Sequence, residues 1–153
     1  MSDIFLDSDG VMADFERGFQ EQFGLQFHNT AASKAWSLIR KTPDFYAKLP
    51  LMAGAEDIWY ALRDKKVSIL TGCPSSGFDD AAAAKRQWWE KNFGPHVHVI
   101  TCLSKDKYLH MRQPGDILID DHVKNIDAWE RANGVGFLHQ NSDLTVVYIS
   151  KME

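Results

Sequence analysis

Residues 1–15 read MSDIFLDSDGVMADF, and the middle of this stretch decides the fold. Ile4–Leu6 is a short apolar run, and Asp7-Ser8-Asp9-Gly10 follows it at once. A short apolar run of this kind is typical of a buried strand. A polar turn directly behind such a strand is typical of the edge where parallel α/β sheets collect their ligands. The stretch therefore predicts a first strand whose carboxyl end carries chemistry.

The same arrangement recurs along the chain, because further apolar runs alternate with segments of helical spacing. This alternation predicts an α/β fold with a largely parallel sheet between layers of helices. The first four runs lack polar alternation, which favours interior strands covered on both faces. The runs are Ile4–Leu6, Val67–Leu70, Val97–Thr101, Ile117–Ile119, Val135–Leu138 and Thr145–Ile149, and the helical segments are Ala55–Lys65, Asp79–Asn92 and Ile126–Asn133.

One interval is too long for a simple crossover. About sixty residues separate the first two runs, where about half that number would do. The segment is too aromatic for a disordered loop, which predicts a small helical insertion over the end of the sheet. We expect a single domain over residues 1–153, with the insertion at about residues 15–53. Its aromatic residues include Phe15, Phe19, Phe23, Phe27, Trp36, Phe45 and Tyr46.

Polar residues follow the other predicted strands as well. Thr71-Gly72 comes after the second run, Lys105 and Lys107 come shortly after the third, and Asp120-Asp121 comes after the fourth. With Asp7 and Asp9, this places four carboxylates at one edge of one sheet. Close carboxylates repel one another unless cations neutralise them. An oxygen-only ligand set suits Mg²⁺, whereas Zn²⁺ would favour His or Cys.

These motifs resemble those of the haloacid dehalogenase superfamily of phosphotransferases, in the order Asp7-Ser8-Asp9-Gly10-Val11, Thr71, a lysine and Asp120-Asp121. The opening stretch through Phe15 is similar to that of the 5′(3′)-deoxyribonucleotidase family, as are residues 49–55 and the run leading from Asp120-Asp121 to Asn125 and Trp129. The resemblance covers most of the chain. It implies a haloacid dehalogenase-like Rossmannoid fold of three layers, with a parallel sheet and a small helical cap inserted after the first strand.

The resemblance also implies a two-step phosphate transfer. Asp7 would be the nucleophile and form an aspartyl-phosphate, and Asp9 would act as general acid and then as general base. Mg²⁺ would be held by Asp7, by the main-chain carbonyl of Asp9, and by Asp120 or Asp121.

The phosphate site that the resemblance implies consists of Thr71, the amide of Gly72 and a lysine. Lys107 best matches the family position of that lysine, and Lys105 is the near alternative. Lys85, on the predicted helix after the second strand, matches a phosphate-contacting lysine of the nucleotidases, but a solvated helix charge explains it equally well.

The insertion would select the substrate. Superfamily members use such a cap to close over the site, and flat aromatic side chains suit stacking on a base. Trp36, Phe45 and Tyr46 are the candidates for the substrate pocket, although aromatic residues in such a segment often belong to its core.

The expected function is a Mg²⁺-dependent phosphatase of a nucleoside or deoxynucleoside monophosphate. A phosphatase of another small phosphomonoester, either a sugar phosphate or a nucleic-acid end phosphate, is the first alternative. A regulatory module that has lost activity is the second, and the intact motif residues Asp7, Asp9, Thr71 and Asp120-Asp121 argue against it.

The composition of the chain restricts the kinds of partner and the cellular location that we expect. The chain of 153 residues has 17 Lys and Arg against 21 Asp and Glu, a formal charge of −4 that argues against a nucleic-acid partner. Cys73 and Cys102 lie in no CxxC pair, which is typical of reduced thiols. The acidic beginning of the chain does not resemble a signal peptide, and no apolar stretch approaches the length of a membrane span. We expect a cytoplasmic protein with a small phosphorylated substrate, and the sequence leaves its oligomeric state open.

Overall fold

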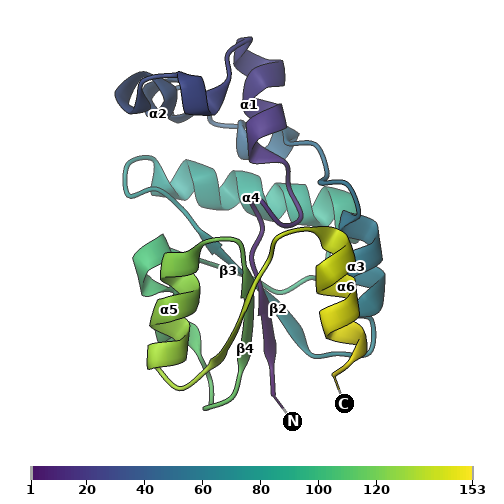
Figure 1. The fold of residues 1–153 in the computed structure, drawn as a ribbon. Helices are drawn as coiled ribbons and strands as arrows, with labels where there is room; N and C mark the ends of the chain where they lie inside the picture. The colour runs from purple at the N-terminus through teal and green to yellow at the C-terminus, as the bar shows by residue number, and fades with distance from the viewer. Residues whose placement is uncertain (1, 153) are drawn as a thin grey trace.

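The computed structural model describes residues 2–152, and its centre is a parallel sheet (Figure 1). The order is β3-β2-β1-β4-β5, with every neighbouring pair parallel. The predicted parallel α/β fold is confirmed. The strands are β1 (Ile4–Leu6), β2 (Val67–Gly72), β3 (Val99–Cys102), β4 (Ile117–Asp120) and β5 (Val135–Leu138).

Two expectations about the strands are wrong. The run Val97–Thr101 was expected to be an interior strand, but β3 lies at the edge of the sheet. The run Thr145–Ile149 is not a strand at all, because it lies inside helix α6 (Ser142–Ser150). The side chain of Asn141 caps this helix by accepting a hydrogen bond from the backbone N–H of Leu144 at 2.9 Å. Thr145 and Ile149, four residues apart, are both buried on one helix face, so the β-branched run follows the helical period.

The two faces of the sheet are covered by different helices. Alternate strand residues point to opposite faces, so Leu6 and Ile69 pack on one side and Phe5 and Leu118 on the other. The first side is covered by α3 (Ala55–Ala61), α4 (Phe78–Phe93) and α6. The second is covered by α5 (Val123–Arg131), whose Trp129 packs on Phe5 with ring centroids 5.1 Å apart. This is the expected three-layer arrangement.

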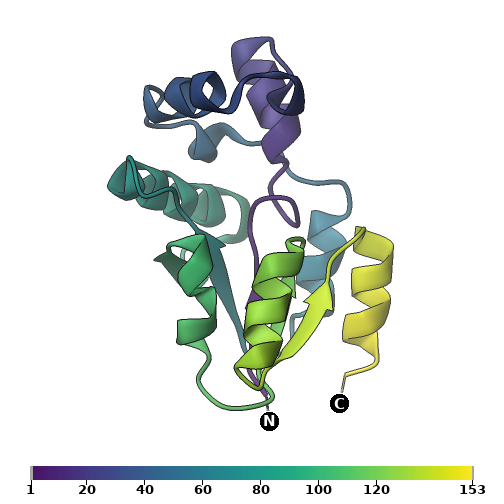
Figure 2. The same ribbon diagram turned by 60° about the vertical axis from the view of Figure 1, so that its left-hand side comes forward.

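The helical segment expected after the first strand is present and lies over the end of the sheet at which β1 stops (Figures 1 and 2). It contains α1 (Phe15–Phe23), the 3-10 turn η1 (Phe27–Asn29), α2 (Ala32–Arg40) and the 3-10 turn η2 (Tyr46–Lys48). Asp14 caps α1, since its side chain accepts from the backbone N–H of Arg17 at 3.1 Å. We call residues 15–53 the cap.

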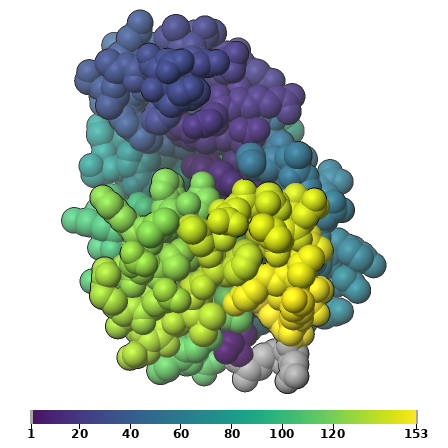
Figure 3. Space-filling view, viewed as in Figure 1, coloured from purple at the N-terminus to yellow at the C-terminus, as the bar shows by residue number. Residues whose placement is uncertain are grey.

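Aromatic residues form the interior of the cap. Phe15, Phe19, Phe23 and Phe45 pack against one another, mostly edge to face, and Phe19 and Phe45 are fully buried. The cap rests on α4, because the indole N–H of Trp88 donates to the carbonyl of Leu49 at 2.8 Å. Figure 3 shows the cap in close contact with the core below it. Helix α4 therefore fixes the position of the cap over the sheet.

No helix within residues 2–152 combines the length and the apolar character that a membrane crossing requires.

A buried carboxylate holds the opposite end of the sheet together. Asp116 is fully buried just before β4, and its Oδ1 accepts from the backbone N–H of Asp3 at 3.0 Å. Its Oδ2 accepts from the backbone N–H groups of Arg112 and Gln113, at 2.9 and 3.0 Å. One side chain therefore ties the start of β1 to the loop before β4.

We expect Asp116→Ala to lower the free energy of unfolding by about 3 kcal/mol or more, because it leaves buried N–H donors without an acceptor. Urea unfolding monitored by circular dichroism measures the loss. Asp127→Ala, an exposed position on α5, is the control and should change stability by less than about 0.5 kcal/mol. Equal stability of the two variants would contradict this role of Asp116.

Candidate active site

The predicted site residues meet at the carboxyl edge of the sheet. Asp7 follows β1 directly, Thr71 is the last residue but one of β2, and Asp120 is the last residue of β4. The chain then leaves β1 through Gly10, whose φ of +84° is in the left-handed region that favours glycine. A Cβ at this position would collide with the carboxylate of Asp121, so a glycine is also needed for the close approach of these two loops.

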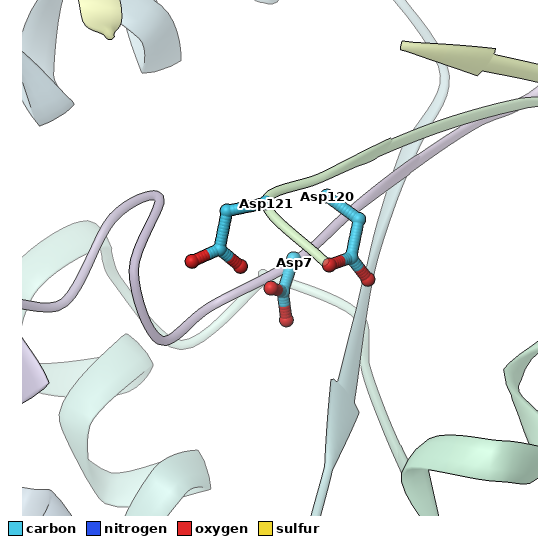
Figure 4. Close-up of side chains that lie close together, drawn as sticks. All are labelled: Asp7, Asp120 and Asp121. Carbon is cyan, nitrogen blue, oxygen red and sulfur yellow. The ribbon is translucent and has the colours of Figure 1, made fainter. Parts of the chain in front are cut away.

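Three carboxylates form a compact group (Figure 4). Asp7, Asp120 and Asp121 each have an oxygen within 4.8 Å of the others, and the side chains converge from the ends of β1 and β4. Asp7 and Asp120 are buried. Asp121 Oδ1 is a buried oxygen without a hydrogen-bond partner among residues 2–152. Such an orphaned acceptor indicates that something outside the chain completes the site.

Lys107 lies between two of these carboxylates. Its Nζ donates to Asp7 Oδ1 at 2.8 Å and to Asp120 Oδ2 at 2.7 Å, and only 3% of the side chain is exposed. It comes from the 3-10 turn η3 (Ser104–His110), in which residues two apart point in different directions. Lys105, the near alternative, is therefore exposed and has no contact with the carboxylates. The structure brings Lys107 into the site and leaves Lys105 outside it.

The electrostatics of Asp7 and Asp120 differ. Burial raises the pKa of Asp7 well above its usual value, the negative charges of Asp120 and Asp121 raise it further, and Lys107 only partly opposes this. Burial also acts to raise the pKa of Asp120. Lys107, the backbone N–H of His122 and the Asn125 amide outweigh it, so the pKa of Asp120 is lowered.

The arrangement fits a divalent cation. Three carboxylates and one ammonium group leave a net charge of −2 in a buried space. Asp120 already accepts from Lys107, from the backbone N–H of His122 at 2.9 Å and from Asn125 Nδ2 at 3.1 Å. Asp121 Oδ1 accepts no hydrogen bond from the described part of the chain, so Asp121 has the freer oxygen of the two. The cluster could therefore hold a hard metal ion with oxygen ligands.

Asp9 lies outside this cluster and pairs with a second buried lysine. Lys85 Nζ donates to Asp9 Oδ2 at 2.7 Å, to Thr71 Oγ1 at 2.9 Å and to the carbonyl of Gly72 at 2.7 Å. Its side chain is only 3% exposed, so Lys85 is not a solvated helix charge. The ring of Tyr46, from the cap, lies 4.6 Å from the same Nζ. Lys85 thus joins Asp9, the end of β2 and the cap.

Gly72 is needed where η3 approaches β2. A Cβ at Gly72 would meet the Cβ of Ser104 at 2.9 Å, closer than real side chains come. The absence of a side chain lets η3 lie against the strand end, which carries Lys107 toward Asp7. The sequence argument assigned Gly72 a phosphate-binding amide, and the structure adds this steric role.

A cavity of about 330 Å³ lies between the cap and the loop after β2. Trp36 and Tyr46 line it, so two of the three predicted pocket residues are brought together there. Phe45 is fully buried inside the cap and does not line the cavity. Arg40 and Asp80 also line the cavity, and sequence reasoning singled out neither.

Sequence reasoning did not assign a site role to Ser104 or Asn125. Asn125 Nδ2 lies 3.2 Å from Ser104 Oγ and donates to Asp120 Oδ2 at 3.1 Å, so the pair orients that carboxylate. The signal for Asn125 is its place in the first turn of α5, one helical turn after Asp120-Asp121. Ser104 gives no comparable signal, because its partner lies 21 positions away.

No protein-family model matches the chain. The chain is similar to the human cytosolic 5′(3′)-deoxyribonucleotidase, at 29% identity over 143 residues that cover 77% of this chain and 69% of that protein. Among solved structures, a haloacid dehalogenase-superfamily hydrolase from Ehrlichia chaffeensis matches with a TM-score of 0.58, at 11% identity, covering 97% of each chain. A haloacid dehalogenase-family enzyme from Bacteroides thetaiotaomicron, solved as a magnesium complex, matches with a TM-score of 0.50, at 15% identity, covering 92% of this chain and 93% of that one.

The match to these solved structures spans the sheet and the helical segment after β1, because it covers 97% and 92% of the chain. The chain has a haloacid dehalogenase-like fold, with an acidic cluster at the edge of its sheet. Its sequence similarity is to the 5′(3′)-deoxyribonucleotidases, and it is a distant one, at about 29% identity.

The opposite pKa directions of Asp7 and Asp120 predict opposite effects on stability. With metal removed by a chelator at neutral pH, Asp7→Asn should raise Tm, by about 2–4 °C for each kcal/mol gained, because burial and two like charges oppose the ionised form. Asp120→Asn should lower Tm, because the ionised form is the favoured one there. Differential scanning calorimetry measures both. A fall of Tm in both variants would contradict this account of Asp7.

Proposed function

We propose that the protein is a Mg²⁺-dependent phosphomonoesterase that acts through an aspartyl-phosphate on Asp7, with a nucleoside monophosphate as its substrate. The observation that carries the proposal is the pairing of two carboxylates, two residues apart, with two different buried lysines: Asp7 with Lys107 and Asp9 with Lys85. The two carboxylates are thereby held in different environments, as a nucleophile and an acid/base group require.

Asp7 has one oxygen already occupied. Oδ1 accepts from Lys107 Nζ at 2.8 Å and from the backbone N–H of Ser8 at 2.9 Å, which leaves Oδ2 as the attacking atom. In the first step Oδ2 forms a bond to phosphorus and the bond from phosphorus to the ester oxygen breaks. In the second step a water oxygen attacks the same phosphorus, phosphate leaves and Asp7 is restored.

Asp9 would move the protons of both steps. Lys85 occupies Oδ2, so Oδ1 is the oxygen that gives a proton to the departing alcohol and then accepts one from the attacking water. Thr71 Oγ1 accepts from Lys85, which leaves the hydroxyl hydrogen free to be donated to a phosphoryl oxygen. The Gly72 amide is the second proposed donor to that group.

Magnesium would be held by Asp7 and Asp121, with the main-chain carbonyl of Asp9 as the third protein ligand and Asp120 as the residue that orients Lys107. Asp121 is favoured over Asp120 by its unpartnered Oδ1. When bound, the ion supplies charge that stabilises the phosphoryl oxygens and positions them for attack.

A nucleoside is the leaving group that the cavity under the cap suits. Trp36 and Tyr46 offer flat apolar surfaces to the cavity, and the Tyr46 ring lies 4.6 Å from Lys85 Nζ, so a base in the cavity would have its phosphate on the side of the Asp9–Lys85 pair. The similarity to deoxyribonucleotidases supports the same class of substrate. A sugar phosphate would fill less of the cavity and would leave the aromatic pair unused. A sugar phosphate remains the alternative substrate, and kinetics on nucleotides and sugar phosphates distinguish the two.

We expect the purified protein with Mg²⁺ to release phosphate from nucleoside monophosphates and p-nitrophenyl phosphate, and Asp7→Asn to abolish turnover. A chelator should abolish it reversibly. A malachite-green assay measures the phosphate, and Asp127→Asn, the same substitution on the exposed side of α5, serves as the control. A wild-type protein inactive on nucleotides, sugar phosphates and p-nitrophenyl phosphate would remove the phosphatase proposal.

Base stacking predicts a selective effect of Trp36→Ala. This side chain is 39% exposed and has no contact with Lys85, so its loss should raise KM for nucleotides about three- to tenfold and leave sugar phosphates and p-nitrophenyl phosphate unchanged. Tyr60→Ala, an exposed aromatic on α3, is the matched control. Equal losses on all substrates would show that Trp36 supports the cap and does not read a base.

A further inference from the structure

A second open space lies between η3 and α5, on the far side of the sheet from α4. Its volume is about 710 Å³, larger than the cavity under the cap. Lys105 and Tyr108 line it from η3, and Lys124, Ala128, Arg131 and Ala132 line it from α5. We call this space the basic groove.

The charge of the groove is opposite to that of the chain. No carboxylate lines it, and Lys105, Lys124 and Arg131 form no ion pair with any of residues 2–152. In contrast, Lys107, from the same turn as Lys105, is fully paired within the active site. A cluster of unpaired cations in a protein of net charge −4 is a local positive field that attracts anions.

The cations are spread along the groove. Lys124 and Arg131 are seven positions apart on α5, which separates them by about 10 Å along the helix axis, and Lys105 lies on the opposite wall. Ala128 and Ala132 lie along the same helix face and leave the floor open. This distribution suits a chain of anionic groups better than a single phosphate, which needs converging donors.

An exposed aromatic ring further restricts the class of ligand that the groove suits. Tyr108 is 40% exposed at the groove, where its ring can stack on a flat group. Cations along an open groove with an aromatic side chain beside them are the combination that binds single-stranded nucleic acid. An acidic peptide would use the charges and leave the ring without a partner.

The groove adjoins the catalytic cluster. Ser104 and Asn125 line its inner end, and Asn125 Nδ2 donates to Asp120 Oδ2 at 3.1 Å. Asp120 in turn accepts from Lys107, which donates to Asp7. A short chain of hydrogen bonds, through Asn125, Asp120 and Lys107, therefore connects the groove with Asp7.

We propose that the basic groove binds a short single strand of nucleic acid through its phosphodiester groups, with Lys105, Lys124 and Arg131 as the phosphate contacts and Tyr108 stacking on a base. The net charge of the chain argued against such a partner. The cations come from two separate elements, so no basic run marks them in the sequence. The proposal does not depend on the phosphatase activity.

Fluorescence anisotropy with a short fluorescein-labelled oligothymidylate that carries no terminal phosphate tests the proposal, in the presence of a chelator. We expect salt-dependent binding with a slope of log K against log salt of about −2 for three contacts. Each of Lys105→Gln, Lys124→Gln and Arg131→Gln should flatten the slope by about 0.7, and Tyr108→Ala should weaken binding about tenfold.

The control for net charge is the triple variant Lys34→Gln/Lys91→Gln/Lys151→Gln, which removes the same charge from exposed lysines outside the groove. It should bind like the wild type, whereas the groove triple variant should not bind. Equal losses in the two triple variants, or no binding by the wild type, would overturn the proposal. So would unchanged binding by Tyr108→Ala together with equal competition by polyglutamate. Thermal unfolding verifies that each variant is folded. If the groove triple variant does not fold, the three single variants test the proposal without it.

Discussion

The candidate active site depends on one buried ammonium group shared by two carboxylates. Lys107 lies 2.8 Å from Asp7 and 2.7 Å from Asp120, with all three side chains removed from water. Burying these charges is costly, and their mutual attraction offsets the cost only while the geometry is kept. One ammonium group cannot neutralise Asp7, Asp120 and Asp121 together. The same arrangement that fixes Asp7 therefore leaves a negative site that could hold a metal ion.

Asp7 and Asp9 reach different lysines although only Ser8 separates them. Ser8 is buried between them, and its Oγ accepts from the indole N–H of Trp89 in the core at 3.0 Å. The backbone is thus anchored between the two carboxylates. Lys107 arrives from the turn after β3 and Lys85 from the helix after β2. The sheet order, with β2 and β4 on either side of β1, makes both approaches available.

The strand ends were predictable because each is a local signal: Asp7 behind Ile4–Leu6 and Asp120 behind Ile117–Ile119 need no knowledge of the rest of the chain. Local sequence could not decide between Lys105 and Lys107, because that choice depends on how η3 is oriented against β2. The run in helix α6 was assigned to a strand because β-branched residues are typical of strands, although Asn141 caps the helix and Thr145 and Ile149 are spaced by one helical turn. The basic groove was not predicted from the sequence for a related reason, since its cations come together only when η3 packs beside α5.

The cap contacts the lysine that pairs with Asp9, besides forming a wall of the cavity. Tyr46 lies over Lys85, and Lys85 Nζ donates to Asp9, to Thr71 and to the carbonyl of Gly72. A change in the position of the cap therefore changes the surroundings of Lys85, and through it the orientation of Asp9. Since the same ring lines the cavity, a group bound there contacts the residue that supports Lys85. The wall of the cavity and Asp9 are therefore two direct contacts apart, through Tyr46 and Lys85.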